Sequence, residues 1–77
     1  MSLDAIMAEE GWVTIAVAAR LCGINESTVT RLIESGDLTG TRAGKRRFVS
    51  IFSLKNHYKD AKPVLRRLKR YENEHVR

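Results

Sequence analysis

Two short amphipathic helices with only three residues between them constrain the fold of this chain more than any other feature of its sequence. Apolar side chains recur at helical spacing over residues 15–22 and again over residues 26–35. Between the two stretches stand Gly23, Ile24 and Asn25. A glycine-containing turn of this length between amphipathic helices is the helix-turn-helix arrangement. The sequence therefore predicts one such unit in the first half of the chain.

The residues at the ends of both helices favour helix starts and stops. Thr14 and Asn25 are predicted N-caps, because their side chains can accept a hydrogen bond from a free N–H group of the first helical turn. Gly23 and Gly36 suit the left-handed backbone that commonly follows a last turn. The buried stripes are predicted to be Ile15, Ala18, Ala19 and Cys22 in the first helix, and Val29, Leu32 and Ile33 in the second.

A basic β-hairpin is predicted after the second helix. Threonine, phenylalanine and valine over residues 38–50 favour strands, and Gly44 supplies a turn residue, so the tip is expected near residues 43–45. Consecutive strand residues point to opposite faces, so Arg46 and Arg47 cannot both face the same ligand. We expect one of them to contact phosphate and the other to cover the core with its aliphatic stem. Four positive charges gather at this tip: Arg42, Lys45, Arg46 and Arg47.

The N-terminal segment, residues 1–11, is predicted to hold either a short helix or a frayed end. Ser2 is a suitable N-cap for such a helix, and Gly11 would stop it. Trp12 and Val13 would then form a short extended entry into the domain.

A third helix and a final basic helix are predicted beyond the hairpin. Ser53 is expected to cap the third helix, which would run over residues 54–61. Pro63 interrupts this helix or starts a new one at its first position. The final helix could self-associate, dock a partner, fold back over Val17 and Leu21, or use its basic residues as a phosphate-binding arm. Its apolar stripe consists of Val64, Leu65, Leu68 and Tyr71.

Length and composition limit the chain to one small domain. Its 77 residues, with 43% apolar and 30% charged side chains, suit a modest folded core. We expect an α+β, mainly α fold. In it, a winged helix-turn-helix over residues 12–61 is flanked by the N-terminal segment and by a basic amphipathic helix over residues 62–77.

Sequence features of enzymes, metal sites and membrane proteins are missing. No glycine-rich phosphate loop, nucleophile motif or carboxylate pair is visible, so we expect no catalytic activity and no cofactor. His57 and His75, with Cys22 as the single cysteine, are too far apart for an obvious zinc motif. The lone cysteine, with no secretory signal and no apolar run near ~18 residues, predicts a cytoplasmic protein without membrane contact.

Positive charge is concentrated toward the C-terminus. The net charge is +5, and residues 62–77 carry six basic against two acidic side chains, whereas residues 1–24 carry one basic against three acidic. A basic half of this kind indicates a polyanionic partner. The alternative is a basic surface that is only solvated.

The second helix and the hairpin together resemble a known group of proteins. Residues 23–38, GINESTVTRLIESGDL, resemble the recognition-helix signature of the excisionase-like and MerR-like winged-helix families. These families share a helix that ends in glycine plus an apolar residue, a small cap, a threonine–apolar pair and a closing glycine-x-leucine. Residues 41–48 resemble their wing, and Ser53-Leu54 resembles the start of the next helix. The similarity covers about residues 12–60.

Four residues depart from the family pattern. Many relatives carry glutamate where this chain has Val17, and Asn25 replaces the usual serine cap. Arg31-Leu32 stands where MerR-type recognition helices carry an aromatic pair, which favours the excisionase-like family. That resemblance implies a bacterial or phage-encoded recombination directionality factor, which bends an attachment site for a phage or mobile-element integrase. The alternatives are a small MerR-like transcriptional regulator and an interaction or DNA-packaging adaptor that docks through its C-terminal helix.

Two groups of residues are predicted to contact double-stranded DNA. Residues near the start of a recognition helix come closest to base edges in the major groove, and Arg31 can make a bidentate contact to guanine. A β-tip is narrow enough to enter the minor groove, where negative potential attracts arginine. The alternative is a solvated helix face beside a hairpin whose charges only resist edge pairing. The predicted contacts are Ser27, Thr28, Thr30 and Arg31 in the helix, and Arg42, Lys45, Arg46 and Arg47 in the hairpin.

Overall fold

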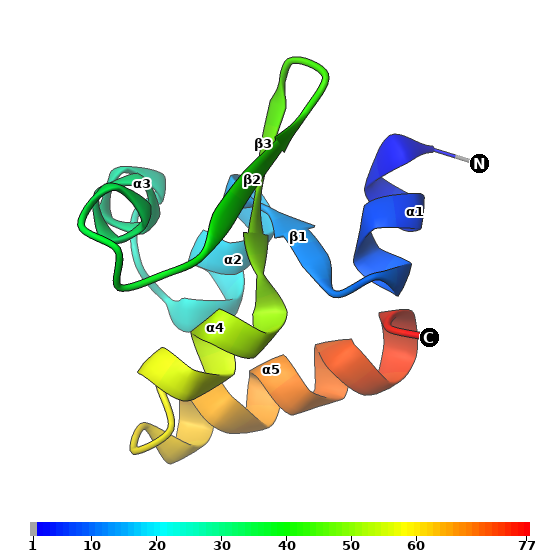
Figure 1. The fold of residues 1–77 in the computed structure, drawn as a ribbon. Coiled ribbons are helices and arrows are strands. Elements are labelled where there is room, and N and C mark those ends of the chain that lie inside the picture. Colours follow the sequence, from blue (N-terminus) through cyan, green and yellow to red (C-terminus); the bar gives the residue numbers. More distant parts are fainter. Residues whose placement is uncertain (1) are drawn as a thin grey trace.

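The chain folds into short helices around a small antiparallel sheet. A computed structural model describes residues 2–77, which form five helices and three strands (Figure 1). The expected α+β, mainly α class with a winged helix-turn-helix is confirmed. In chain order the elements are α1 Leu3–Glu9, β1 Trp12–Thr14, α2 Ile15–Cys22, α3 Glu26–Glu34, β2 Gly40–Ala43, β3 Arg46–Ser50, α4 Ile51–His57 and α5 Lys62–His75.

The predicted start and stop of α2 are confirmed. The Thr14 side chain accepts a hydrogen bond from the backbone N–H of Val17 at 3.2 Å. Gly23 follows the last turn with φ 69°, and its N–H donates to the carbonyl of Ala19. Glycine adopts this left-handed backbone at little cost, so the chain can turn directly from α2 into α3. Helix α3 then packs against α2.

The start of α3 differs from the prediction in its chemistry. Asn25 stands at the N-cap position with extended backbone, but its side chain makes no capping hydrogen bond within residues 2–77. Its carbonyl instead accepts from the N–H groups of Thr28 and Val29, at 3.0 and 3.2 Å. The prediction that the Asn25 side chain caps α3 is therefore wrong. The helix also ends at Glu34, one residue before the predicted end.

The hairpin forms as predicted and gains a third strand. The sheet order is β1-β3-β2, with both pairs antiparallel. Gly44 and Lys45 make the two-residue loop, and φ of Gly44 is 62°, as the first loop position of a type II′ turn requires. The extended entry at Trp12 and Val13 is confirmed, and it pairs with the end of β3.

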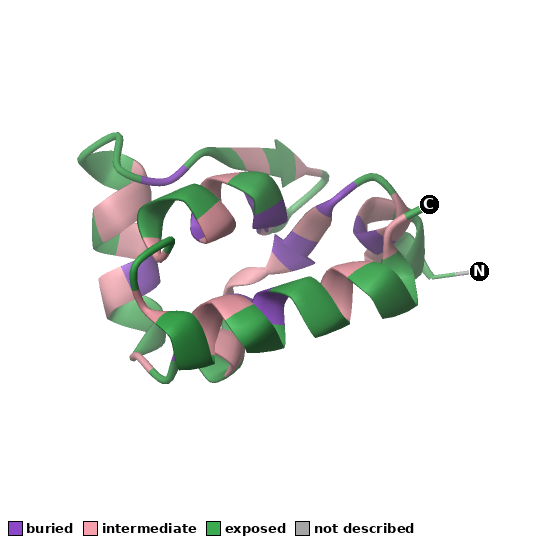
Figure 2. Ribbon diagram, turned by 90° about the horizontal axis from the view of Figure 1, so that it is seen from below, coloured by how far each residue is buried: buried purple, intermediate pink, exposed green. Residues whose placement is uncertain are grey.

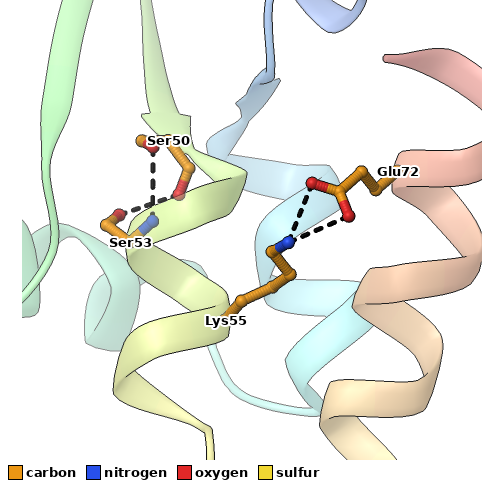
Figure 3. Close-up of polar contacts among 4 residues, drawn as sticks. All are labelled: Ser50, Ser53, Lys55 and Glu72. Carbon is orange, nitrogen blue, oxygen red and sulfur yellow. Dashed lines mark hydrogen bonds and ion pairs between the residues drawn. The ribbon is translucent and has the colours of Figure 1, made fainter.

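The start of α4 corrects the prediction that Ser53 is the cap. Ser50 is the N-cap, since its side chain accepts from the Ser53 N–H at 3.3 Å, while the Ser53 hydroxyl donates to the Ser50 carbonyl at 2.8 Å (Figure 3). The strand therefore passes into the helix without a linker. The helix ends at His57 rather than at Ala61.

The last helix, α5, folds back onto its own domain. Pro63 lies in its first turn, as predicted for a new helix, and Leu68 is fully buried. The helix packs against α1, α2 and α4, and Lys55 of α4 reaches both carboxylate oxygens of Glu72 at 2.9 Å (Figure 3). Of the roles that the sequence left open for the apolar stripe, intramolecular packing is the one observed.

The buried side chains lie between the sheet and helices α2, α3, α4 and α5 (Figure 2). Val13 and Val49 point from the sheet into this core, where Leu54 and Leu68 meet them from α4 and α5. Phe48 is also fully buried, but strand alternation places it on the opposite face of the sheet, toward α1. The sheet is thus covered on both faces near its base, and its tip stays free. None of the helices in residues 2–77 has the length and apolar run needed to cross a membrane.

The wing approaches α3 at a position where only a hydrogen fits. A Cβ on Gly40 would lie 2.7 Å from Cγ2 of Ile33, closer than real carbon contacts come. We therefore expect Gly40→Ala to lower the free energy of unfolding by about 1–3 kcal/mol, the usual cost of overpacking. Urea denaturation followed by circular dichroism measures this loss.

A double-mutant cycle isolates that contact. Ile33→Ala alone should also destabilise, because it removes apolar packing. In the double variant the clash is gone. Its loss of unfolding free energy should therefore be smaller than the sum of the losses in the two single variants. Strict additivity would contradict the proposed contact between Gly40 and Ile33.

Candidate nucleic-acid interface

The exposed side of α3 presents three of the four predicted helix contacts. Ser27 and Arg31 are exposed and Thr30 is half-buried, and their spacing places them on one side of the helix, opposite the buried Val29. Thr28 is half-buried and lies about 60° from Arg31 around the helix but about 160° from Thr30. Ser27 and Arg31 are therefore central on this side of α3. Thr30 lies on the flank toward Ile33, which touches the wing, and Thr28 lies on the flank away from it.

Acidic residues mark both ends of this helix side. Glu26 in the first turn and Glu34 in the last turn are both exposed. Carboxylates repel phosphate, so they leave the middle of the helix as the part best suited to approach a duplex. Arg31 and Thr30 occupy that middle.

The wing places two arginines on the side that faces α3. Arg42 and Arg47 are directly opposite each other across β2 and β3. Strand alternation puts both on the same sheet face as Gly40, whose backbone lies against Ile33 of α3. Arg42 is exposed and Arg47 is half-buried. Like charges directly opposite each other destabilise a sheet. The repulsion between Arg42 and Arg47 therefore destabilises the hairpin of the free protein, and a bound polyanion would reduce it.

Arg46 points the other way. It lies on the sheet face toward α1, and its guanidinium is 3.2 Å from a carboxylate oxygen of Asp4. The sequence required Arg46 and Arg47 to diverge without saying which would face α3, and the structure assigns Arg47 to that side. Lys45 is exposed in the loop at the tip, between the two faces.

The α3 side chains and the wing arginines form one composite surface, here called the α3–wing surface: Ser27, Thr30, Arg31, Arg42 and Arg47. Figure 1 shows the hairpin projecting beside α3 and away from the body of the domain. The base of the wing is fixed to α4, since Thr39 donates its N–H to the Ser53 hydroxyl at 3.1 Å and accepts from the Ser50 N–H at 2.8 Å. The hairpin therefore has a defined orientation relative to α3.

Sequence reasoning missed the residues that set this orientation. Gly40 and Thr39 touch no ligand, yet they fix the distance and angle between the wing and α3. A glycine inside a strand is a recognised signal of close backbone approach. That signal was present at Gly40, whereas nothing in the sequence pointed to the Thr39–Ser53 hydrogen bond.

Cys22 is unsuited to act as a nucleophile. It is buried, and this burial raises the pKa of its thiol to about 11, so the thiol stays protonated near neutral pH. The nearby Arg67 opposes this shift only in part. Across residues 2–77 no three histidine, cysteine, aspartate or glutamate side chains gather in a way that could hold a metal ion.

Comparison with known proteins gives one match. The family model of the helix-turn-helix domain matches residues 12–55, which is more than half of the chain and includes α2, α3, the wing and most of α4. No curated protein and no solved structure matches. Helix-turn-helix domains place their second helix in the DNA major groove, and here that helix is α3. The chain belongs to the helix-turn-helix domain family and carries its DNA-binding architecture with a β-hairpin wing.

Proposed function

We propose that the protein binds double-stranded DNA with sequence specificity through the α3–wing surface and serves as an excisionase without catalytic activity of its own. The observation that carries the binding proposal is the cross-strand pair Arg42 and Arg47 beside the exposed side of α3. Neither guanidinium group forms an ion pair among residues 2–77. Two such groups next to a helix of the right class form a surface complementary to a polyanion.

In this proposal α3 reads bases and the wing holds phosphates. A helix is about 10 Å wide, which suits the major groove, where base edges present distinct donors and acceptors. Arg31 would donate two hydrogen bonds to a guanine, and Thr30 and Ser27 would bond a base or a phosphate. Arg42 and Arg47 would reach the backbone or the adjacent minor groove, where arginine is favoured.

The excisionase assignment rests on resemblance and on the packing of α5. Residues 23–38 carry the excisionase-like signature, with Arg31-Leu32 in place of the aromatic pair of MerR-type helices. The adaptor alternative needs an apolar docking stripe on α5. In the structure Leu68 of that stripe is fully buried, and Val64 and Tyr71 pack on the core. A protein with this architecture would bend DNA for a partner integrase in the cytoplasm.

A recombination assay tests this role. Purified protein and the integrase encoded beside its gene are incubated with a supercoiled plasmid that carries the element's two junctions. The proposal predicts that excision depends on the protein and that its binding site lies beside a junction. Sequence-specific binding at a promoter, without any effect on excision, would instead make the protein a transcriptional regulator.

Arg31→Ala should relax the sequence preference of binding. Loss of a bidentate guanine contact removes about 1–3 kcal/mol of discrimination at one base pair. The measurement is competition among duplexes mutated at each position of a site selected from a random pool. Wild-type protein should show a strong guanine preference at one position, and the variant should lose it there while keeping preferences elsewhere.

Lys59→Ala is the matched control for this experiment. Lys59 is exposed in the turn that joins α4 to α5. Figure 1 shows this turn at the end of α4 that is remote from the wing. Its loss removes the same charge and should leave every base preference unchanged. A uniform weakening by Arg31→Ala across all duplexes would show that Arg31 contacts only phosphate, and base reading would have to come from other residues.

A further inference from the structure

The solvent side of α5 is a continuous line of positive charge. Four of its five exposed lysine and arginine residues recur at intervals of four, three and one residues, opposite the buried Leu68. The fifth, Arg67, turns toward α2, where its Nε donates to the Leu21 carbonyl at 2.6 Å. At ~1.5 Å per residue this line covers about 12 Å of helix. We call this set the α5 stripe: Lys62, Arg66, Lys69 and Arg70.

The acidic side chains of α5 form no ion pair with the α5 stripe. Glu72 turns toward α4 and is held by Lys55 through both of its oxygens at 2.9 Å. Glu74 lies one helical turn beyond Arg70 and lines the same shallow pocket, together with Leu21 and Arg67. Among the ion pairs within residues 2–77, none involves a member of the α5 stripe. Its charge is therefore not neutralised inside the protein.

The composition of the α5 stripe fits a nucleic acid better than a protein. Protein interfaces are built on aromatic or aliphatic anchors and are depleted in lysine. The large apolar residues exposed in the described chain are Leu3, Ile6 and Phe52, which lie on α1 and α4 and not on α5. Duplex DNA carries about one negative charge per 1.7 Å of axis, a density that four cations in about 12 Å can contact together.

The α5 stripe faces away from the α3–wing surface. The buried side of α5 packs against α1, α2 and α4, so its charged side points out of the far side of the domain. Figure 1 shows the wing projecting from one side and α5 running along the opposite side. A straight duplex seated on α3 and the wing would leave the α5 stripe open to another ligand.

We propose that the α5 stripe binds a second segment of duplex DNA through its phosphates, so that one molecule bridges two duplexes. This inference rests on the proposed binding of a first duplex by the α3–wing surface. It would give an architectural role to a protein that brings distant DNA segments together. The second contact would show no sequence preference, because the stripe carries flexible cations on a surface helix and no constrained base-reading side chains.

A two-duplex capture assay tests the bridge. A duplex with the selected site is immobilised, protein is bound to it, and capture of a labelled 40-base-pair duplex of random sequence is measured at about 50 mM salt. Arg66→Gln/Lys69→Gln should lower this capture by about tenfold. The slope of log capture against log salt should fall by about 1.8, at ~0.9 per lost phosphate contact. Binding to the immobilised duplex should stay within about twofold of wild type, and the melting temperature should not change.

Lys59→Gln/Arg77→Gln is the control for charge, because it removes the same charge from exposed positions outside the α5 stripe. Arg77 lies 3.8 Å from a carboxylate oxygen of Glu9, so this control matches the stripe variant in charge and not in ion pairing. It should capture the labelled duplex as wild type does. Equal capture by the two variants, or no capture by wild type, would overturn the proposal. So would weaker binding of the stripe variant to the immobilised duplex with unchanged capture, since the stripe would then touch the same, bent duplex. Displacement of the labelled duplex by polyglutamate at lower charge concentration than by unlabelled duplex would point to an acidic protein and also overturn it.

Failure of the bridge and failure of the proposed function give different results in this assay. If the α3–wing surface does not bind DNA, Arg42→Gln/Arg47→Gln will bind the immobilised duplex as well as wild type does. If only the bridge is wrong, that variant will lose the first duplex and the stripe variant will behave as the control does.

Discussion

Arg42→Gln/Arg47→Gln is expected to weaken binding to the selected duplex by about 100-fold. Hydrogen bonds to charged groups contribute about 1.5 kcal/mol or more each, and ~1.4 kcal/mol corresponds to a factor of ten. The slope of log affinity against log salt should become shallower by about 1.8, because two phosphate contacts at ~0.9 each are lost. Fluorescence anisotropy at several salt concentrations measures both quantities.

The folded protein should not be harmed by this change. Arg42 and Arg47 face each other across β2 and β3, and their repulsion opposes hairpin formation in the absence of DNA. Glutamine keeps the length and polarity of the side chains and removes that repulsion. The free energy of unfolding should therefore stay the same or rise slightly, which separates a binding defect from a folding defect.

Arg46→Gln is the internal control for the wing. It removes the same charge from the neighbouring position, but Arg46 lies on the other sheet face and pairs with Asp4 at 3.2 Å. We expect it to change the slope of log affinity against log salt by well under ~0.9, the value for one lost phosphate contact. A loss as large as that of the Arg42/Arg47 variant would mean that the duplex lies against the α1 side of the wing, and the orientation described for the α3–wing surface would be wrong.

Leu68→Ala is expected to destabilise the fold severely. Leu68 is fully buried among α2, α4 and α5, and removing a buried leucine side chain costs about 2–5 kcal/mol. Small domains are stable by only about 5–15 kcal/mol, and each kcal/mol shifts the melting temperature of a chain of this size by about 4–8 °C. The melting temperature should fall by at least about 10 °C at every protein concentration.

The dependence of the melting temperature on protein concentration distinguishes intramolecular packing of α5 from dimer formation through α5. If the apolar stripe of α5 joined two copies, the melting temperature would rise with protein concentration, and Leu68→Ala would halve the solution mass. Lys69→Ala, at the next position, is exposed and should leave stability nearly unchanged. A concentration-dependent melting temperature of the wild-type protein would contradict the intramolecular role of Leu68.

The parts of the fold that depend on local signals could be predicted. Thr14, Gly23 and Gly36 delimit α2 and α3 because caps and left-handed backbone are properties of a few adjacent residues. Gly44 marks the hairpin tip for the same reason. The pairing of β1 with β3 joins Trp12 to Ser50 across most of the domain, and no local pattern encodes such a contact.

The misplaced cap of α4 shows how tertiary context decides between two equal candidates. Ser50 and Ser53 are both good N-caps, and Ser53 precedes the more obvious apolar spacing. Ile51 is buried with the core, which pulls the helix start three residues earlier and leaves Ser53 free to bond Thr39 of the wing base. The sequence contains both serines but not the contact that assigns their roles.

The candidate site was predicted as a set of residues and not as a surface. The exposure of Ser27 and Arg31 could be predicted from helical spacing, because it depends on α3 alone. Strand alternation separates Arg46 from Arg47, but only the contact of Gly40 with Ile33 and the ion pair of Arg46 with Asp4 decide which faces α3. The orientation of the wing is a tertiary property, so it could not be read from residues 40–50.

The most direct test of the α3–wing surface is a backbone amide NMR titration of the labelled protein. One equivalent of the selected duplex is added at about 200 mM salt, where weaker phosphate contacts are released. We predict that the largest shift changes fall on residues 27–31 of α3 and on Arg42 and Arg47 of the wing. Shift changes confined to α1 or to α5, with α3 unaffected, would contradict the account.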